Sequence, residues 1–215
     1  MNVIDPGKSL VEQTYTALLD AICSGQLEPG TRLSQDSLAE TLQVSRQPVN
    51  SAIAMLKAQK FVEDTGRRGV IVAPISSVFF RAMYEFRSGI DPLAVRLATP
   101  RMDEKSILAG RRIIAAGKQA IISGSASQAI QADMNFHNMI YDLSGNVLIR
   151  DVMTLNWRHQ QRAMGQVLQN PGMTISVWKE HEDIFEKMVQ GQSEEAAQAA
   201  ENHVRNAAER FCPAG

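Results

Sequence analysis

The chain has 215 residues, 44% of them hydrophobic and 21% charged, so it has a globular composition and is long enough for two small domains. The 22 basic and 23 acidic residues leave a net charge of −1, so a nucleic-acid binder would have to concentrate its positive groups locally. The sequence has no signal peptide or membrane span, and Cys23 and Cys212 fit neither a disulfide framework nor a metal spacing, so we expect a cytoplasmic protein.

Residues 1 to 75 are predicted to form three helices followed by a β-hairpin. The first helix lies in SLVEQTYTALLDAICSG and ends at Gly25, a residue suited to a left-handed cap. Ser34 and Ser45 are placed as N-caps of the next two helices, because serine hydroxyls accept hydrogen bonds from the N–H groups of a first turn. Helical spacing predicts these core residues: Leu10, Tyr15, Leu18, Leu19, Ile22, Leu38, Ala39, Leu42, Val49, Ala52, Ile53 and Leu56.

The third helix presents polar side chains at its N-terminal end. Arg46, Gln47 and Asn50 lie on or near the face opposite its apolar residues. Two short helices joined by a tight turn, the second carrying such residues, have the geometry that places a recognition helix in the DNA major groove. Spacing alone fits an ordinary three-helix core with a solvated face equally well.

A hairpin follows the third helix. Segments 61–64 and 70–73 have the pattern of two short strands, and the glycine-flanked tip between them carries Arg67 and Arg68. With Arg32, which lies in the turn before the second helix, these arginines would supply phosphate and groove contacts around a recognition helix.

The sequence of this region resembles that of a known protein family. The stretch LEPGTRLSQDSLAETLQVSRQPVNSAIAMLKAQKFVEDTGRRGVIVAP is similar, almost end to end, to the winged helix-turn-helix of the GntR family of bacterial transcriptional regulators, with LxPGxRL, LAxxLxVSRxPV and a glycine-bearing wing. The family usually has arginine at the position of Asn50; since asparagine pairs with adenine and arginine with guanine, we expect a different operator sequence. The resemblance implies DNA contacts from Arg32, Ser45, Arg46, Gln47, Asn50, Arg67, Arg68 and Gly69.

A change of composition at Pro74 marks the end of the first domain, and residues 76–215 contain no strand signal. Short loops between long helical segments predict an antiparallel all-α bundle. The protein is therefore expected to be mainly α, with a winged helix-turn-helix domain over 1–75 and a six-helix domain over 76–215. The predicted helices span residues 76–99, 103–122, 126–143, 146–168, 173–190 and 193–211.

Four ionisable side chains fall on the inward stripes of three of these helices. Asp133 and His137 are four residues apart on one helix face. The fifth helix places His181 among Ile175, Trp178, Ile184, Phe185 and Met188, and the sixth places His203 among Ala196, Ala200, Val204 and Ala207. A single buried histidine is usually a hydrogen-bonded core residue, but burying four such groups is unfavourable unless something pairs them. One divalent cation bound by all four would do so.

An arginine also falls on an inward stripe. Arg87 lies amid Phe80, Met83, Ile90, Ala94 and Leu97 of the first bundle helix, and a buried guanidinium requires a carboxylate or phosphate. Either Asp133 pairs with it, or Arg87 and an open metal position together bind a small carboxylate ligand. His159 is left outside the cluster, as a polar lining residue or a surface residue.

The second half of the chain carries a resemblance too. MYEFRSGIDPLAVRLAT, DMNFH followed by SGN, EHEDIF and NHVRNA are similar to the FCD ligand-binding domain of the FadR-type branch, in its shorter VanR-like form. The resemblance implies a divalent metal held by Asp133, His137, His181 and His203 beneath an organic-acid effector, with Arg87 near the effector. Zinc is expected ahead of nickel or manganese. Asp91 stands where glutamate is commoner, which we treat as a small departure.

These observations favour a transcriptional regulator over an enzyme. We expect a homodimer that binds a palindromic operator in double-stranded DNA and responds to a small carboxylate effector. The alternatives are a metal-dependent hydrolase-like enzyme, since a catalytic metal also keeps a coordination position open, and a regulator whose metal is purely structural. An enzyme has no use for a recognition helix, and no general base or nucleophile accompanies the four ligands.

Overall fold

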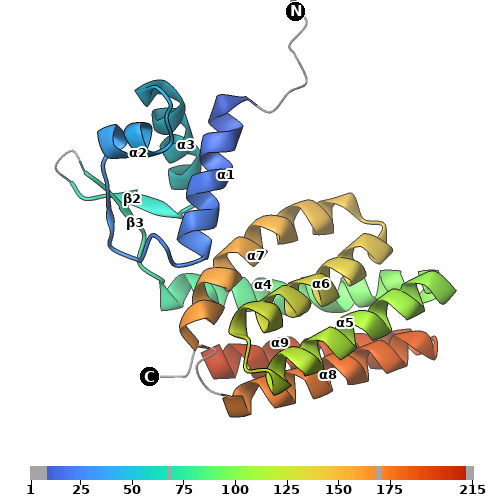
Figure 1. The fold of residues 1–215 in the computed structure, drawn as a ribbon. Helices are drawn as coiled ribbons and strands as arrows, with labels where there is room; N and C mark the ends of the chain where they lie inside the picture. The colour runs from blue at the N-terminus through green and yellow to red at the C-terminus, as the bar shows by residue number, and fades with distance from the viewer. Residues whose placement is uncertain (1–8, 67–68, 168–170, 212–215) are drawn as a thin grey trace, which may run out of the picture. The chain divides into compact units, whose positions relative to one another are not determined.

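The computed structural model describes residues 9–66, 69–167 and 171–211 (Figure 1). The chain divides into two compact units, residues 1–75 and 76–215. Cys23 is buried in the first unit, and Cys212 lies outside the described residues.

The N-terminal unit contains three helices, α1 (Leu10–Cys23), α2 (Gln35–Thr41) and α3 (Arg46–Ala58). Helix α1 begins in a capping box in which the Ser9 hydroxyl accepts from the backbone of Glu12 and the Glu12 carboxylate accepts in return. The predicted apolar face of α3 is fully buried against α1. Leu10, which we expected in the core, is the first residue of α1 and is 59% exposed.

Three short strands complete this unit: β1 (Arg32–Leu33), β2 (Val62–Asp64) and β3 (Val70–Val72). They form an antiparallel sheet in the order β1-β3-β2, with Arg32 opposite Ile71. The expected hairpin is thus confirmed, but Arg32 lies in a strand rather than in the predicted turn. We did not predict this strand, because two residues are too few to show the alternation of buried and exposed side chains that indicates a strand.

The C-terminal unit has six α-helices in its described part, each within two residues of its predicted bounds. A 3-10 turn, η1 (Thr99–Arg101), fills what was predicted to be a loop. The bundle helices are α4 (Ser77–Ala98), α5 (Glu104–Ile122), α6 (Ala126–Ser144), α7 (Val147–Val167), α8 (Pro171–Val189) and α9 (Ser193–Phe211).

Helix α4 packs against α6 and α9, while α5 packs against α6 and α8, and α8 lies alongside α9 (Figure 1). Their shared core contains Phe136, Met153, Trp157, Trp178 and Phe185. Ile175 was expected in this core, but it lies near the start of α8 and is 51% exposed. The predicted mainly-α fold is confirmed.

Candidate metal centre and nucleic-acid interface

Three helices bring three imidazoles together in the core of the bundle. His137 of α6, His181 of α8 and His203 of α9 are buried, and each offers a ligand atom within 4.8 Å of the other two. The Nε2 atoms of His181 and His203 are 3.3 Å apart, and a carboxylate oxygen of Asp133 lies 3.4 Å from the same His181 atom. The three imidazoles therefore form one buried cluster, and Asp133 lies against His181 at its edge.

The spacing and the unpaired atoms of this cluster fit a metal ion. Two ligands about 2.0–2.1 Å from a tetrahedral Zn²⁺ are about 3.3–3.4 Å apart, as these atoms are. Among the ring nitrogens of the cluster, His137 Nε2 is buried without a hydrogen-bond partner; His181 Nδ1 is also unpaired, but it is not the nitrogen that faces His203 and Asp133. Burial lowers the pKa of both histidines well below the ordinary value, so they stay neutral and keep a lone pair for a metal. Three imidazole nitrogens and a carboxylate are a donor set that zinc accepts.

A carboxylate outside the cluster orients one of the histidines. Glu180 of α8 lies 2.8 Å from Nδ1 of His203, so that nitrogen carries the proton and Nε2 presents its lone pair to the cluster. Asn206 and Arg210, on the same helix as His203, donate to the same carboxylate at 2.9 Å and 3.2 Å. Burial alone would raise the pKa of Glu180, but the hydrogen bonds from His203 and Arg210 lower it to about 2.

The buried arginine has a partner that the sequence did not identify. The Arg87 guanidinium donates to one oxygen of Asp91 at 3.1 Å from Nε and 2.7 Å from NH2, and the Tyr141 hydroxyl donates to the other at 2.8 Å. Burial lowers the pKa of Arg87, but Asp91 raises it above the usual arginine value. The pairing of Arg87 with Asp133 that we considered is therefore not its hydrogen-bonded arrangement. Asp91, which we treated as a small departure from the family pattern, is thus the ion-pair partner of Arg87.

Asp133 instead faces the histidines. Burial raises the pKa of its carboxyl to about 6, although the nearby His203 and Arg87 favour the ionised form. An unpaired carboxylate in this position is thus unfavourable without a cation, which agrees with its role as a ligand.

A small cavity lies beside the cluster. Its volume is about 10 Å³, which is roughly the room that one water molecule needs. The residues lining it are Asp91, Val95, Phe136, His137, Ile140, Tyr141, Ile184, Ala200 and His203. The ring of Trp157 covers His137, with ring centres 5.0 Å apart, and lies 5.3 Å from the Arg87 guanidinium carbon.

His159 is neither on the surface nor in the cluster. It is 5% exposed, and its ring packs edge-on against Phe79 of α4, with centres 4.7 Å apart. Our surface alternative for His159 was therefore wrong; the ambiguous stripe of α7 gave no signal of this contact.

The start of α3 presents an exposed polar face. Arg46, Gln47 and Asn50 are exposed, as a recognition helix requires. Ser45 occupies the N-cap position, but its hydroxyl makes no capping hydrogen bond, contrary to our expectation. Arg46 forms an ion pair with Asp36 of α2, which holds the two helices of the motif together at this end.

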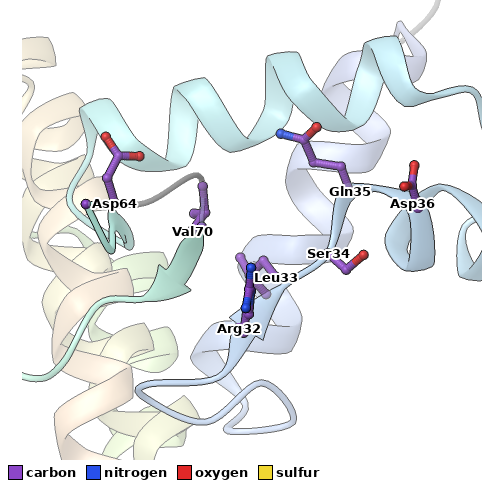
Figure 2. Close-up of a pocket in the computed structure, with 9 residues that line it drawn as sticks. Arg32, Leu33, Ser34, Gln35, Asp36, Asp64 and Val70 are labelled. Atoms are coloured by element: carbon purple, nitrogen blue, oxygen red, sulfur yellow. The ribbon is translucent and has the colours of Figure 1, made fainter.

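A polar groove of about 900 Å³ runs between the sheet and the start of α2 (Figure 2). Arg32, Asp36 and Asp64 contribute side chains to its wall. Gly69 is buried beside them, where a Cβ atom would stand 2.5 Å from the Thr65 hydroxyl, so a larger residue would displace that side chain. The wing-tip residues Arg67 and Arg68 lie outside the described residues.

The fold and the two sites define a class of protein: a DNA-binding winged helix-turn-helix joined to a helical bundle with an internal ligand cluster. Residues 10–72 match the model of the bacterial regulatory proteins of the gntR family, and residues 82–206 match the FCD domain. The chain belongs to the GntR family of transcriptional regulators and carries an FCD domain.

Relatives and solved structures agree with this assignment. The chain is 24% identical over 202 residues to an uncharacterized HTH-type transcriptional regulator, YdhC of Bacillus subtilis, covering 93% of this chain and 89% of that one. It is 22% identical to the HTH-type transcriptional repressor RspR of Escherichia coli, covering 96% and 90%. The fold matches E. coli McbR/YncC with a TM-score of 0.80, at 19% identity over 93% of this chain and 95% of that one.

A putative GntR regulator from Rhodococcus sp. RHA1 has the same fold, with a TM-score of 0.83 at 20% identity over 97% of this chain and 100% of that one. The protein is a transcriptional regulator with a DNA-binding domain, not an enzyme. No helix in the described part of the chain is both long and apolar enough to cross a membrane.

Proposed function

We propose that this regulator binds a palindromic operator as a homodimer and that a small organic acid, bound at a divalent metal in the bundle, changes its affinity for DNA. The observation that carries this proposal is the convergence of three buried imidazoles and the Asp133 carboxylate on one point in the core. When bound, the metal would hold these helices together and, by expanding beyond its four protein ligands to a fifth position, would accept the carboxylate of an acid. Zinc suits the three-nitrogen, one-oxygen set best, ahead of nickel or manganese.

The metal ligands would be Asp133, His137, His181 and His203. Asp133 and the neutral imidazoles need a cation to offset the cost of burying them. Glu180 would hold His203 in the tautomer that binds a metal, because its carboxylate accepts a hydrogen bond from the Nδ1–H group of His203. Arg87 lies next to His137, with NH2 3.5 Å from Nδ1, and contributes positive potential near the metal.

The DNA-binding proposal rests on the start of α3. Gln47 and Asn50 are exposed at the end that would enter a major groove, and Arg46 stands beside them. Arg32, exposed on β1, would contact phosphates, and Ser45 has a hydroxyl that makes no capping bond. Arg67, Arg68 and Gly69 are proposed to extend these contacts from the wing.

The small size of the cavity links ligand binding to the packing of the surrounding helices. The cavity has room for about one water, so an acid that binds in it would displace side chains of α4, α6 and α9. Helix α4 carries Arg87 and Asp91 and begins at Ser77, directly after the DNA-binding unit in the chain. A ligand that favours a different packing of α4 would thereby shift the spacing of two recognition helices in a dimer.

The experiment is a DNA-binding titration. An operator is first selected from random double-stranded DNA, and its affinity is measured by fluorescence anisotropy with and without a panel of organic acids. We expect at least one acid to change the affinity of the metal-loaded protein by about 5- to 150-fold, the usual range of allosteric coupling. Protein stripped with a chelator should lose this response. An equal response in stripped protein would remove the metal from the mechanism.

The closed cavity also favours a second candidate, a regulator whose metal only stabilises the bundle. Under that function, stripping the metal lowers the thermal midpoint of the bundle, and no acid alters DNA binding in either state. Our proposal predicts that stripping the metal lowers the thermal midpoint and also removes the effect of the acid on DNA binding.

A further inference from the structure

The acid that fits this bundle is restricted by a carboxylate of the protein itself. Asp91 already neutralises Arg87, because two guanidinium nitrogens donate to one of its oxygens at 3.1 Å and 2.7 Å. Tyr141 donates to the other oxygen at 2.8 Å, and all three side chains are buried. The guanidinium is therefore not an unpaired cation waiting for a ligand.

The buried charges at the site give a definite balance. Among the described residues around the cluster, Arg87 carries a positive charge and Asp91 and Asp133 carry negative ones, which leaves a net charge of minus one. Histidines bound to a metal are neutral. Tyr141 is neutral as well, because burial and then Asp91 raise its pKa well above the ordinary value. A divalent cation thus turns the balance into plus one.

Other charged groups nearby do not alter this balance. Glu180 is paired with Arg210, so together they add no charge. Arg162 is buried, but it follows His159 by three residues on α7, and His159 faces Phe79 rather than the cluster.

The cavity walls oppose a second carboxylate. Val95, Phe136, Ile140, Ile184 and Ala200 give it an apolar lining. Its described lining includes no lysine or arginine, and it does include Asp91. A second anionic group on a ligand would be buried without a partner and next to a like charge, which is strongly unfavourable.

We propose that the bundle selects organic acids with a single negative charge, and that Asp91 excludes dicarboxylates. This inference rests on the proposed function, since it assumes that an acid binds at the metal. The single carboxylate takes the open metal position and cancels the remaining positive charge, and the hydrocarbon part lies against the apolar wall.

The test compares acids that differ by one carboxylate. Isothermal titration calorimetry of the metal-loaded, full-length protein is carried out with butanoate against succinate, and with 2-hydroxybutanoate against malate. We expect the monocarboxylate of at least one pair to bind at least tenfold more tightly. Equal or tighter binding of the dicarboxylates would overturn the charge rule and leave an acid-responsive regulator intact. Binding of none of the four would overturn the rule and count against the proposed function as well.

A charge-changing variant tests the role of Asp91 directly. Asp91→Asn leaves Arg87 unpaired, so the second carboxylate of succinate can take the lost position, and the preference should shift toward succinate by at least tenfold. Asp183→Asn is the matched control, because Asp183 is exposed and pairs with Lys187 away from the cluster. An unchanged preference in Asp91→Asn would refute the role of Asp91.

Metal content is measured before and after each titration, so that a dicarboxylate that removes the metal is not mistaken for one that binds. If Asp91→Asn does not fold, the comparison of acids on the unmodified protein decides the proposal alone.

Discussion

Asn50 is the residue of the DNA-binding face at which we expected a departure from the family's usual arginine. It is exposed at the start of α3 and can pair bidentately with adenine. We predict that Asn50→Ala changes the ranking of single-base operator variants, by about 1–3 kcal/mol at the contacted base pair. Arg32→Ala should instead weaken binding to all variants alike and reduce the salt dependence, as loss of a phosphate contact does. Binding curves for a set of single-base variants measure both effects.

The prediction for Asn50 has a clear negative outcome. If Asn50→Ala leaves relative affinities unchanged while overall affinity falls, this side chain contacts backbone rather than bases.

Glu180 is the residue whose contribution to the metal site is easiest to separate from stability. We predict that Glu180→Gln weakens zinc binding by about 10- to 100-fold, the usual effect of removing a carboxylate that orients a ligand histidine. Glu182→Gln, on the same helix but paired with Lys118, should have no effect. Competition against a chromophoric chelator measures the affinity.

A purely structural role for Glu180 predicts a different pattern. The metal-free protein would then unfold at lower denaturant concentration in Glu180→Gln, while its zinc affinity stayed that of the unmodified protein. That pattern would contradict the orienting role.

At the scale of elements, two glycines allow α5 to approach α8 closely. A Cβ atom at Gly117 would stand 2.1 Å from the Trp178 ring, and one at Gly110 would stand 2.1 Å from the Phe185 ring. Both rings are buried and cannot move aside easily. We predict that Gly117→Ala destabilises the bundle by about 1–3 kcal/mol despite the better helix propensity of alanine.

Gly89 provides the matched control within α4. A Cβ atom there meets nothing within 4 Å, so Gly89→Ala should be neutral or stabilising by up to about 1 kcal/mol. Urea unfolding followed by tryptophan fluorescence reports on the bundle, because both tryptophans, Trp157 and Trp178, lie in it. Equal stability of the Gly117 and Gly89 variants would show that the close packing is not needed.

Helices were more predictable from sequence than strands or depth of burial. Ser76, Asp103 and Ser125 are caps whose side chains accept from the first turn, so they fixed helix starts locally. Periodicity tells which side of a helix is apolar but not how far the core extends, which is why Leu10 and Ile175 were placed wrongly.

The histidine cluster was predictable in part, for a related reason. Its ligands stood out because each is a polar residue on an apolar stripe. The partners that complete the site were missed, since Glu180 meets His203 only through the packing of α8 on α9. Asp91 could have been found, because it follows Arg87 by four residues and a helix brings such pairs together.

At the scale of the whole molecule, the chain combines a DNA-binding unit with a bundle whose core is unusually polar. Arg87, Asp91 and Asp133 are each at most 6% exposed, and three imidazoles share their core. Burying these charged groups is unfavourable unless opposite charges compensate them. The reason for their burial therefore lies in what the bundle binds. The metal-dependent sensor that we propose would account for these groups lying there together.

Native mass spectrometry of the full-length protein during zinc titration tests this account most directly. We predict a dimer that takes up one zinc ion per chain, and that His181→Ala, which removes the ligand closest to both His203 and Asp133, takes up none at the same zinc concentration. A protein that binds no zinc, or a His181→Ala variant that binds as much as the unmodified chain, would contradict the metal centre on which the account depends.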